Sequence, residues 1–113
     1  MKKVAITAMV LALATPVMEA AAGSYVVWGV GSRRCGAWID AQRTNQAKAE
    51  AYQSWVHGFV TGAGFAREGL KLKDLDVRPE TLTKWVDEYC LANPLMTIER
   101  AAVGLLDHIA AEK

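Results

Sequence analysis

Apolar side chains recur every three to four residues along most of the chain, and this spacing predicts four helices. The first helix is expected to start between Ser32 and Cys35, with Ser32 as its N-cap, and to run to about Arg43. A polar break at residues 44–46 separates it from a long second helix over residues 47–68. Gly69 follows at the position where glycine commonly ends a helix, so it is expected to be the C-cap residue.

The second half of the chain repeats this alternation of helix and break. Residues 70–78 mix lysines and aspartates with isolated leucines, which predicts a surface loop. Pro79 suits the first turn of a third helix, and Asn93-Pro94 should end that helix, because the residue before proline is pushed out of the helical region. Pro94 is expected to open the fourth helix.

Each predicted helix carries one apolar stripe, and the four stripes define the expected core. Trp38, Trp85, Tyr89 and Leu105 are its central members. The stripe of the second helix contains Tyr52, Trp55, Val56, Phe59, Val60 and Ala63, and that of the fourth contains Ile98, Ala101, Ala102, Leu105 and Ile109. The pattern predicts an all-α protein, a compact four-helix bundle closed by one disulfide.

Residues 25–30 (YVVWGV) do not follow the helical spacing and are rich in β-branched and aromatic side chains. They predict an extended N-terminal arm, or a short strand without a clear sheet partner. We expect Trp28 and its neighbours to dock on the helices; the alternative is an edge that accepts a partner strand.

The first 22 residues have the features of an export signal. Lys2 and Lys3 precede an uncharged apolar run over residues 4–14, and Ala20 to Ala22 offer small side chains for cleavage. An 11-residue helix is about 16 Å long, whereas the hydrocarbon core of a bilayer is about 30 Å thick. We therefore expect cleavage near Ala20 to Ala22, export to the periplasm, no stable membrane anchor, and a single helical domain over residues 23–113.

Charge and cysteine content narrow the function classes for residues 23–113. Eleven basic and eleven acidic side chains give a formal charge of zero, which argues against a nucleic-acid partner. The chain has two cysteines, Cys35 and Cys90, and an exported domain of this size would use them as a disulfide. Two buried free thiols are the alternative.

The segment from Trp55 to Gly64 contains three glycines inside a predicted helix, and each costs about 1 kcal/mol relative to alanine. Gly58 and Gly62 are four residues apart and lie on one face, beside Trp55 and Phe59. This face is the candidate binding or packing face. It is expected to receive another helix of the bundle closely; the alternative is a groove for a ligand or partner segment.

Chemistry-bearing residues are few. His57 has Thr61 one turn later, but no nucleophile motif surrounds it, so an edge-of-core position is favoured over a catalytic one. The histidines and cysteines lack the spacing of metal sites, and we expect neither metal nor cofactor.

Three motifs together resemble a group of small exported bacterial helical proteins with one disulfide. They are Cys35-Gly36-x-Trp38, Trp55-x-x-Gly58-Phe59-x-x-Gly62, and the run from Trp85 to Leu95 that contains Tyr89-Cys90 and Asn93-Pro94. The layout is also similar to the HdeA-type periplasmic acid-stress chaperones and to the Rap/Tai-type immunity proteins of type VI secretion. The resemblance spans residues 29–109 and implies a disulfide between Cys35 and Cys90.

These observations favour a non-enzymatic periplasmic interaction protein that binds a protein partner in the manner of an immunity protein or inhibitor, with the loop over residues 70–78 contributing to its surface. An HdeA-like acid-stress chaperone is one alternative. A small hydrolase or lyase that uses His57 is the other.

Overall fold

Four helices and one short 3-10 turn form the described part of the chain, which in this computed structural model comprises residues 25–72 and 77–111. The predicted export signal and residues 73–76 of the predicted loop lie outside it. The elements are η2 (Gly29–Ser32), α1 (Cys35–Thr44), α2 (Gln46–Ala66), α3 (Pro79–Ala92) and α4 (Ile98–Ala111). The all-α prediction is confirmed, since the described residues contain one isolated β-bridge, between Arg34 and Thr97, and no strand.

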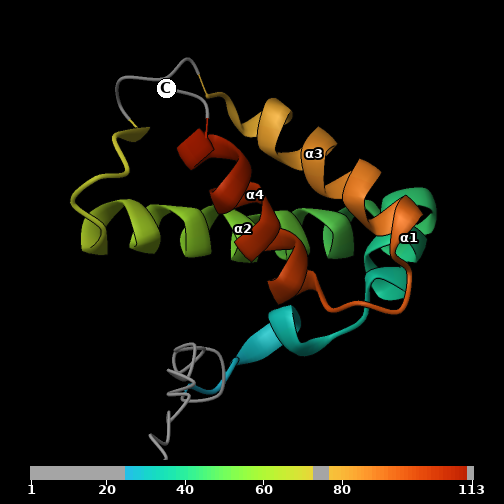
Figure 1. Cartoon of the computed structure of the whole chain (residues 1–113). Helices are drawn as coiled ribbons and strands as arrows, with labels where there is room; N and C mark the ends of the chain where they lie inside the picture. Colours follow the sequence, from blue (N-terminus) through green and yellow to red (C-terminus); the bar gives the residue numbers. More distant parts are fainter. Residues whose placement is uncertain (1–24, 73–76, 112–113) are drawn as a thin grey trace, which may run out of the picture.

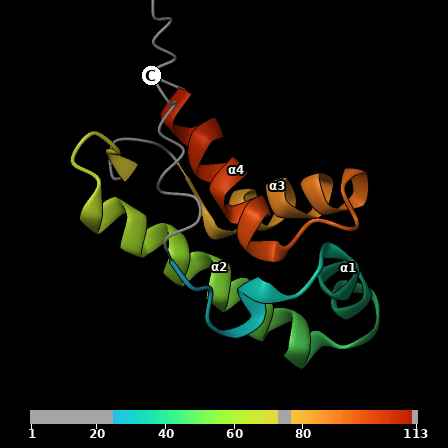
Figure 2. The same cartoon turned by 60° about the horizontal axis from the view of Figure 1, so that its bottom comes forward.

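The helices pack around α2, which runs the length of the molecule (Figure 1). Both α1 and α4 pack against α2 and α3, and η2 lies against α2 and α4. Viewed from below, α1 lies at one end of the molecule and the last turn of α2 at the other (Figure 2). No helix of residues 25–72 and 77–111 is long and apolar enough to cross a membrane.

The core is built from the predicted stripes. Trp38 is fully buried at the centre and Leu105 is nearly so, while Trp85 and Tyr89 are partly buried at its edge. The Trp85 and Tyr89 rings stack with centroids 5.5 Å apart, and Gly104 on α4 leaves room for the indole of Trp85. All five residues expected for the α4 stripe are buried.

The start of α1 corrects one prediction. Ser32 lies in η2, where its hydroxyl donates to the Gly29 carbonyl, so it does not cap α1. The residue at the N-cap position is Arg34, which makes no side-chain cap. Instead, the amide N–H groups of Cys35 and Gly36 donate to the carbonyls of Met96 and Pro94 at 2.7 and 3.2 Å. The first turn of α1 is thus capped by the connection between α3 and α4.

Two other helix ends also differ from the prediction. Helix α2 ends at Ala66 and its C-cap is Arg67 in an extended conformation, so Gly69 is not the C-cap. Pro94 lies in the turn after α3, and α4 begins four residues later at Ile98, where the Thr97 hydroxyl accepts the Arg100 N–H. Pro79 does begin α3, as predicted.

Candidate functional site

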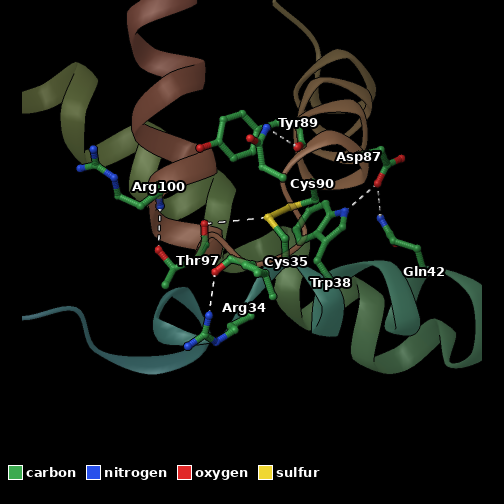
Figure 3. Close-up of a disulfide and its surroundings, with 11 residues drawn as sticks. Arg34, Cys35, Trp38, Gln42, Asp87, Tyr89, Cys90, Thr97 and Arg100 are labelled. Carbon is green, nitrogen blue, oxygen red and sulfur yellow. Dashed lines mark hydrogen bonds between the residues drawn. A yellow bond between two sulfur atoms is a disulfide. The ribbon is translucent and has the colours of Figure 1, made fainter.

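The disulfide joins Cys35 at the start of α1 to Cys90 near the end of α3, which confirms the predicted bond. Both cysteines are fully buried, with their Cα atoms 4.9 Å apart. Figure 3 shows the bond at the junction of α1, α3 and the first turn of α4. Further contacts fix this corner: Arg34 donates to the Leu95 carbonyl at 2.9 Å, and the Ile98 N–H donates to the Arg33 carbonyl at 2.8 Å.

A polar network beside the disulfide holds α1, α2 and α3 together. The indole N–H of Trp38 donates to Asp87 Oδ1 at 2.6 Å, and the Gln42 amide donates to the same oxygen at 3.2 Å (Figure 3). Gln53 on α2 donates in turn to Gln42 at 2.9 Å. Asp87 was not among the predicted site residues. Its signal in the sequence is an acid within the apolar spacing of α3, where the N–H of a buried indole requires an acceptor.

The N-terminal arm docks on the bundle at two points. The Trp55 indole N–H donates to the Trp28 carbonyl at 2.9 Å, and the Tyr25 hydroxyl donates to Glu99, whose side chain is buried. The hydrogen bond to Glu99 raises the pKa of Tyr25, because a phenol that donates to a carboxylate resists ionisation. Trp28 contacts the bundle through its main-chain carbonyl, whereas the residue as a whole is 79% exposed.

Gly29 and Gly31, the two glycines of η2, have a packing role. A Cβ atom on Gly31 would lie 2.2 Å from Cζ2 of Trp55, and one on Gly29 would lie 3.3 Å from the same ring. Gly29 also has a φ of 80°, which side chains other than glycine rarely adopt. The main chain of η2 therefore covers Trp55 closely, because neither Gly29 nor Gly31 has a side chain.

Gly58 and Gly62 have a different environment from the one predicted. A Cβ built on either residue meets no atom of the described residues within 4 Å, so no helix of the described bundle packs there and the close-packing interpretation is wrong. Of the four residues of the candidate face, Trp55 and Phe59 stack with centroids 5.3 Å apart and pack against the core. Gly58 and Gly62 are exposed beside them.

The exposed glycines belong to a continuous stripe along α2 that we call the open face. Its members follow helical spacing and are all exposed: Ser54, Gly58, Thr61, Gly62 and Phe65. Phe65 has 93% of its surface exposed, the largest value among the large hydrophobic residues that the structure describes as exposed. Phe65 was not among the predicted site residues, although its spacing from Gly58 and Gly62 places it opposite the buried stripe of α2.

His57 borders a cleft of about 270 Å³ between α2 and α3. The other residues that line this cleft are Gln53, Pro79, Glu80, Thr83, Lys84 and Asp87. Nε2 of His57 is buried and has no hydrogen-bond partner among the described residues. The Thr61 hydroxyl donates to the His57 carbonyl at 2.8 Å. The Thr61 hydroxyl, which lies one turn after His57, is thus engaged by the main chain of the helix.

The loop predicted over residues 70–78, which was expected to contribute to the binding surface, is described only at its two ends. Leu70 is buried, and Leu72 and Val77 pack against the core, so the described ends of the loop over residues 70–78 are tied down by apolar side chains. Within the described ranges, no three His, Cys, Asp or Glu residues are grouped so as to hold a metal ion.

Comparison of the chain with protein-family models, with curated proteins and with solved structures finds no match. The residues of the chain itself are therefore the basis for the proposed function.

Proposed function

We propose that the protein is a non-enzymatic, exported interaction protein of the periplasm, which binds one protein partner through the open face of α2 in the manner of an inhibitor or immunity protein. The observation that carries this proposal is the open face itself. Gly58 and Gly62 lie in the interior of a 21-residue helix with nothing described against them, and Phe65 follows on the same face.

The energetics of the two glycines support an external role. Each costs about 1 kcal/mol of helix stability relative to alanine, and neither relieves a contact among the described residues. A partner that packs directly on the bare backbone would supply the missing reason for glycine at both positions.

Phe65 would act as the anchor of this interface. Aromatic side chains at the centre of a binding surface commonly contribute more than 1 kcal/mol each, because they bury a large rigid apolar area. Leaving Phe65 in water is unfavourable for the isolated protein, and burial against a partner removes that cost.

The rest of the molecule suits a preformed binding surface in an oxidising compartment. The disulfide between Cys35 and Cys90 restrains the bundle and persists where thiols are not kept reduced. Export would follow from the signal expected in residues 1–22. A surface that is already ordered loses less entropy when it binds.

The test begins by placing a photo-crosslinking phenylalanine analogue at position 65 of the natively exported protein and, as a control, at Lys84, an exposed residue of α3. A partner crosslinked from position 65 and not from position 84 is then purified, and its affinity is measured by calorimetry. Gly58→Leu should weaken binding by more than about tenfold, because the new side chain prevents close approach. Phe65→Ser should have a similar effect, and Lys84→Ala should not.

A Cβ atom at position 58 meets no described atom within 4 Å, so circular dichroism of the Gly58→Leu variant should show an unchanged fold. Equal affinity of the wild-type protein and the two open-face variants would refute the proposal.

A further inference from the structure

The N-terminal arm and the connection between α3 and α4 lie side by side where α4 begins (Figures 1 and 2). The Tyr25 hydroxyl donates to Glu99, and the Arg33 carbonyl accepts the Ile98 N–H at 2.8 Å, so the arm meets the first turn of α4 at both of its ends. The antiparallel bridge between residues 34 and 97 joins the two segments as well. We call the exposed side chains of residues 25–34 and 93–100 the arm surface.

Most of the exposed large apolar residues that the structure describes belong to the arm surface. They are Tyr25, Val26, Trp28, Leu95 and Met96, with exposed fractions between 40% and 79%. Trp28 has the largest of these values, although its carbonyl is bonded to the indole of Trp55. Exposed apolar side chains that gather in two adjacent segments are typical of an interaction surface.

The exposed charged side chains of the arm surface are all arginines. They are Arg33, Arg34 and Arg100. Glu99, the single acidic residue of these two segments, is buried and accepts the Tyr25 hydroxyl. None of the three arginines forms an ion pair with a described residue. Because residues 23–113 have a formal charge of zero, the arginines form a local positive surface on a neutral domain.

The structure around these arginines adds to the positive potential. Helices α1 and α4 both begin beside them, and the amino-terminal end of a helix carries a partial positive charge. Arg34 uses one guanidinium nitrogen to bind the Leu95 carbonyl at 2.9 Å, which leaves further N–H donors for an anion. Figure 3 shows the side chains of Arg34 and Arg100 extending on the side away from Trp38 and Asp87.

We infer that the arm surface binds reversibly to the surface of an anionic phospholipid bilayer. Its arginines would contact lipid phosphates, which guanidinium groups bind well. The rings of Tyr25 and Trp28 would lie among the headgroups, where tyrosine and tryptophan are favoured. A partner that offers only negative charge, such as a nucleic acid, would leave Trp28 and Leu95 in water, whereas a bilayer accepts both kinds of side chain.

The place where the chain enters the described structure also favours a bilayer. Residues 1–22 are the expected export signal, and the described chain begins at Tyr25 on the arm surface. The arm surface is therefore the part of the domain nearest to the expected signal, and hence nearest to the membrane during export. A few arginines and apolar side chains give reversible contact, which agrees with the expectation of no stable membrane anchor.

The test measures binding of the natively exported protein to lipid vesicles by cosedimentation. One set of vesicles contains phosphatidylcholine alone, and the other contains equal amounts of phosphatidylcholine and phosphatidylglycerol. The protein should bind the anionic vesicles more than about tenfold more tightly, and added salt should weaken that binding. Equal binding to both kinds of vesicle, or no binding to the anionic ones, would overturn the inference.

The role of the arginines is tested with two double variants that remove the same charge. Arg33→Gln/Arg100→Gln should weaken binding to the anionic vesicles by about twentyfold, because each arginine near such a surface contributes about fivefold. Lys48→Gln/Arg67→Gln changes two exposed cations outside the arm surface and should have less than about a twofold effect. Arg34 stays in place because it holds the Leu95 carbonyl. Equal effects of the two double variants would contradict a specific arm surface.

The apolar contact is tested with two exposed aromatic residues. Trp28→Ser should weaken vesicle binding by about tenfold and remove most of the shift of tryptophan fluorescence to shorter wavelength that accompanies it. Phe65→Ser, on the open face, should leave vesicle binding unchanged, and circular dichroism should show that both variants are folded. Vesicle binding that is indifferent to Trp28→Ser would refute the inference. Because the proposed partner depends on Phe65 and the bilayer on Trp28, either idea can fail without the other.

Discussion

The disulfide end of the molecule and the far end of α2 differ in how much of their sequence is explained by folding. At the disulfide end, Cys35, Trp38 and Cys90 are fully buried, and main-chain hydrogen bonds join α1 to the residues between α3 and α4. At the far end, a Cβ atom on Gly58 or Gly62 of α2 would meet none of the described residues within 4 Å, and the same face of the helix carries the exposed Phe65. Residues of the first kind stabilise the fold, whereas we propose that those of the second kind serve binding.

Glycine illustrates the difference most directly. Gly31 is required because the Trp55 ring occupies the space where its side chain would be. Gly58 and Gly62 have no such neighbour among the described residues. The same residue type therefore reflects internal packing at one site and, we propose, external contact at the other.

The largest effect is expected from removing the disulfide. Replacing both Cys35 and Cys90 with alanine should lower the free energy of unfolding by about 4 kcal/mol, since the bond closes a loop between positions 55 residues apart and restricts the unfolded chain. Denaturant unfolding followed by circular dichroism measures this loss, and reduced wild-type protein is the control. A loss below about 1 kcal/mol would mean that the disulfide end does not depend on its covalent bond.

A smaller loss of folding stability is expected from a substitution at Gly31. Gly31→Ala should destabilise the protein by about 1–3 kcal/mol, because the new Cβ collides with the indole of Trp55 and the arm has to move. In a Trp55→Leu background the same substitution should cost much less, which a double-mutant cycle would detect. Equal costs in both backgrounds would show that the indole is not what requires glycine.

The smallest expected change is a gain in folding stability, at the two glycines of the open face. Gly58→Ala and Gly62→Ala should each stabilise the protein by about 1 kcal/mol, because alanine favours the helix and its methyl group meets no described atom. The denaturant midpoint should rise while the slope of the transition stays unchanged. Destabilisation at either position would show that part of the chain does cover the open face.

Most of the fold could be predicted from the sequence because periodicity and local signals determine it. The buried stripes of α2 and α4 follow from apolar spacing, and Pro79 marks the start of α3. The errors occur where a distant contact replaces a local one. Ser32 has the side chain of an N-cap, but the carbonyls of Pro94 and Met96 cap α1, and no local pattern encodes that arrangement.

The candidate surfaces were predicted less completely. Trp55, Phe59 and the two glycines were identified from their spacing, but whether another helix covered Gly58 and Gly62 depends on helix placement, which the sequence does not specify. Phe65 was missed because an apolar residue outside the buried stripe of a helix is ordinarily an isolated surface residue. The hollow lined by Ile39 of α1 and Leu91 of α3 was missed because only the tertiary structure brings these two residues together.

The capping of α1 by residues near α4 has a consequence for the order of folding. Ribosomes make the chain from its amino terminus, so Cys35 and Gly36 emerge long before Pro94 and Met96, the residues whose carbonyls complete the first turn of α1. Cys35 likewise waits for Cys90 before it can be oxidised to the native pair. The beginning of the domain is therefore among the last parts to reach its final form, and nascent chains shorter than about residue 98 lack the contacts that fix it.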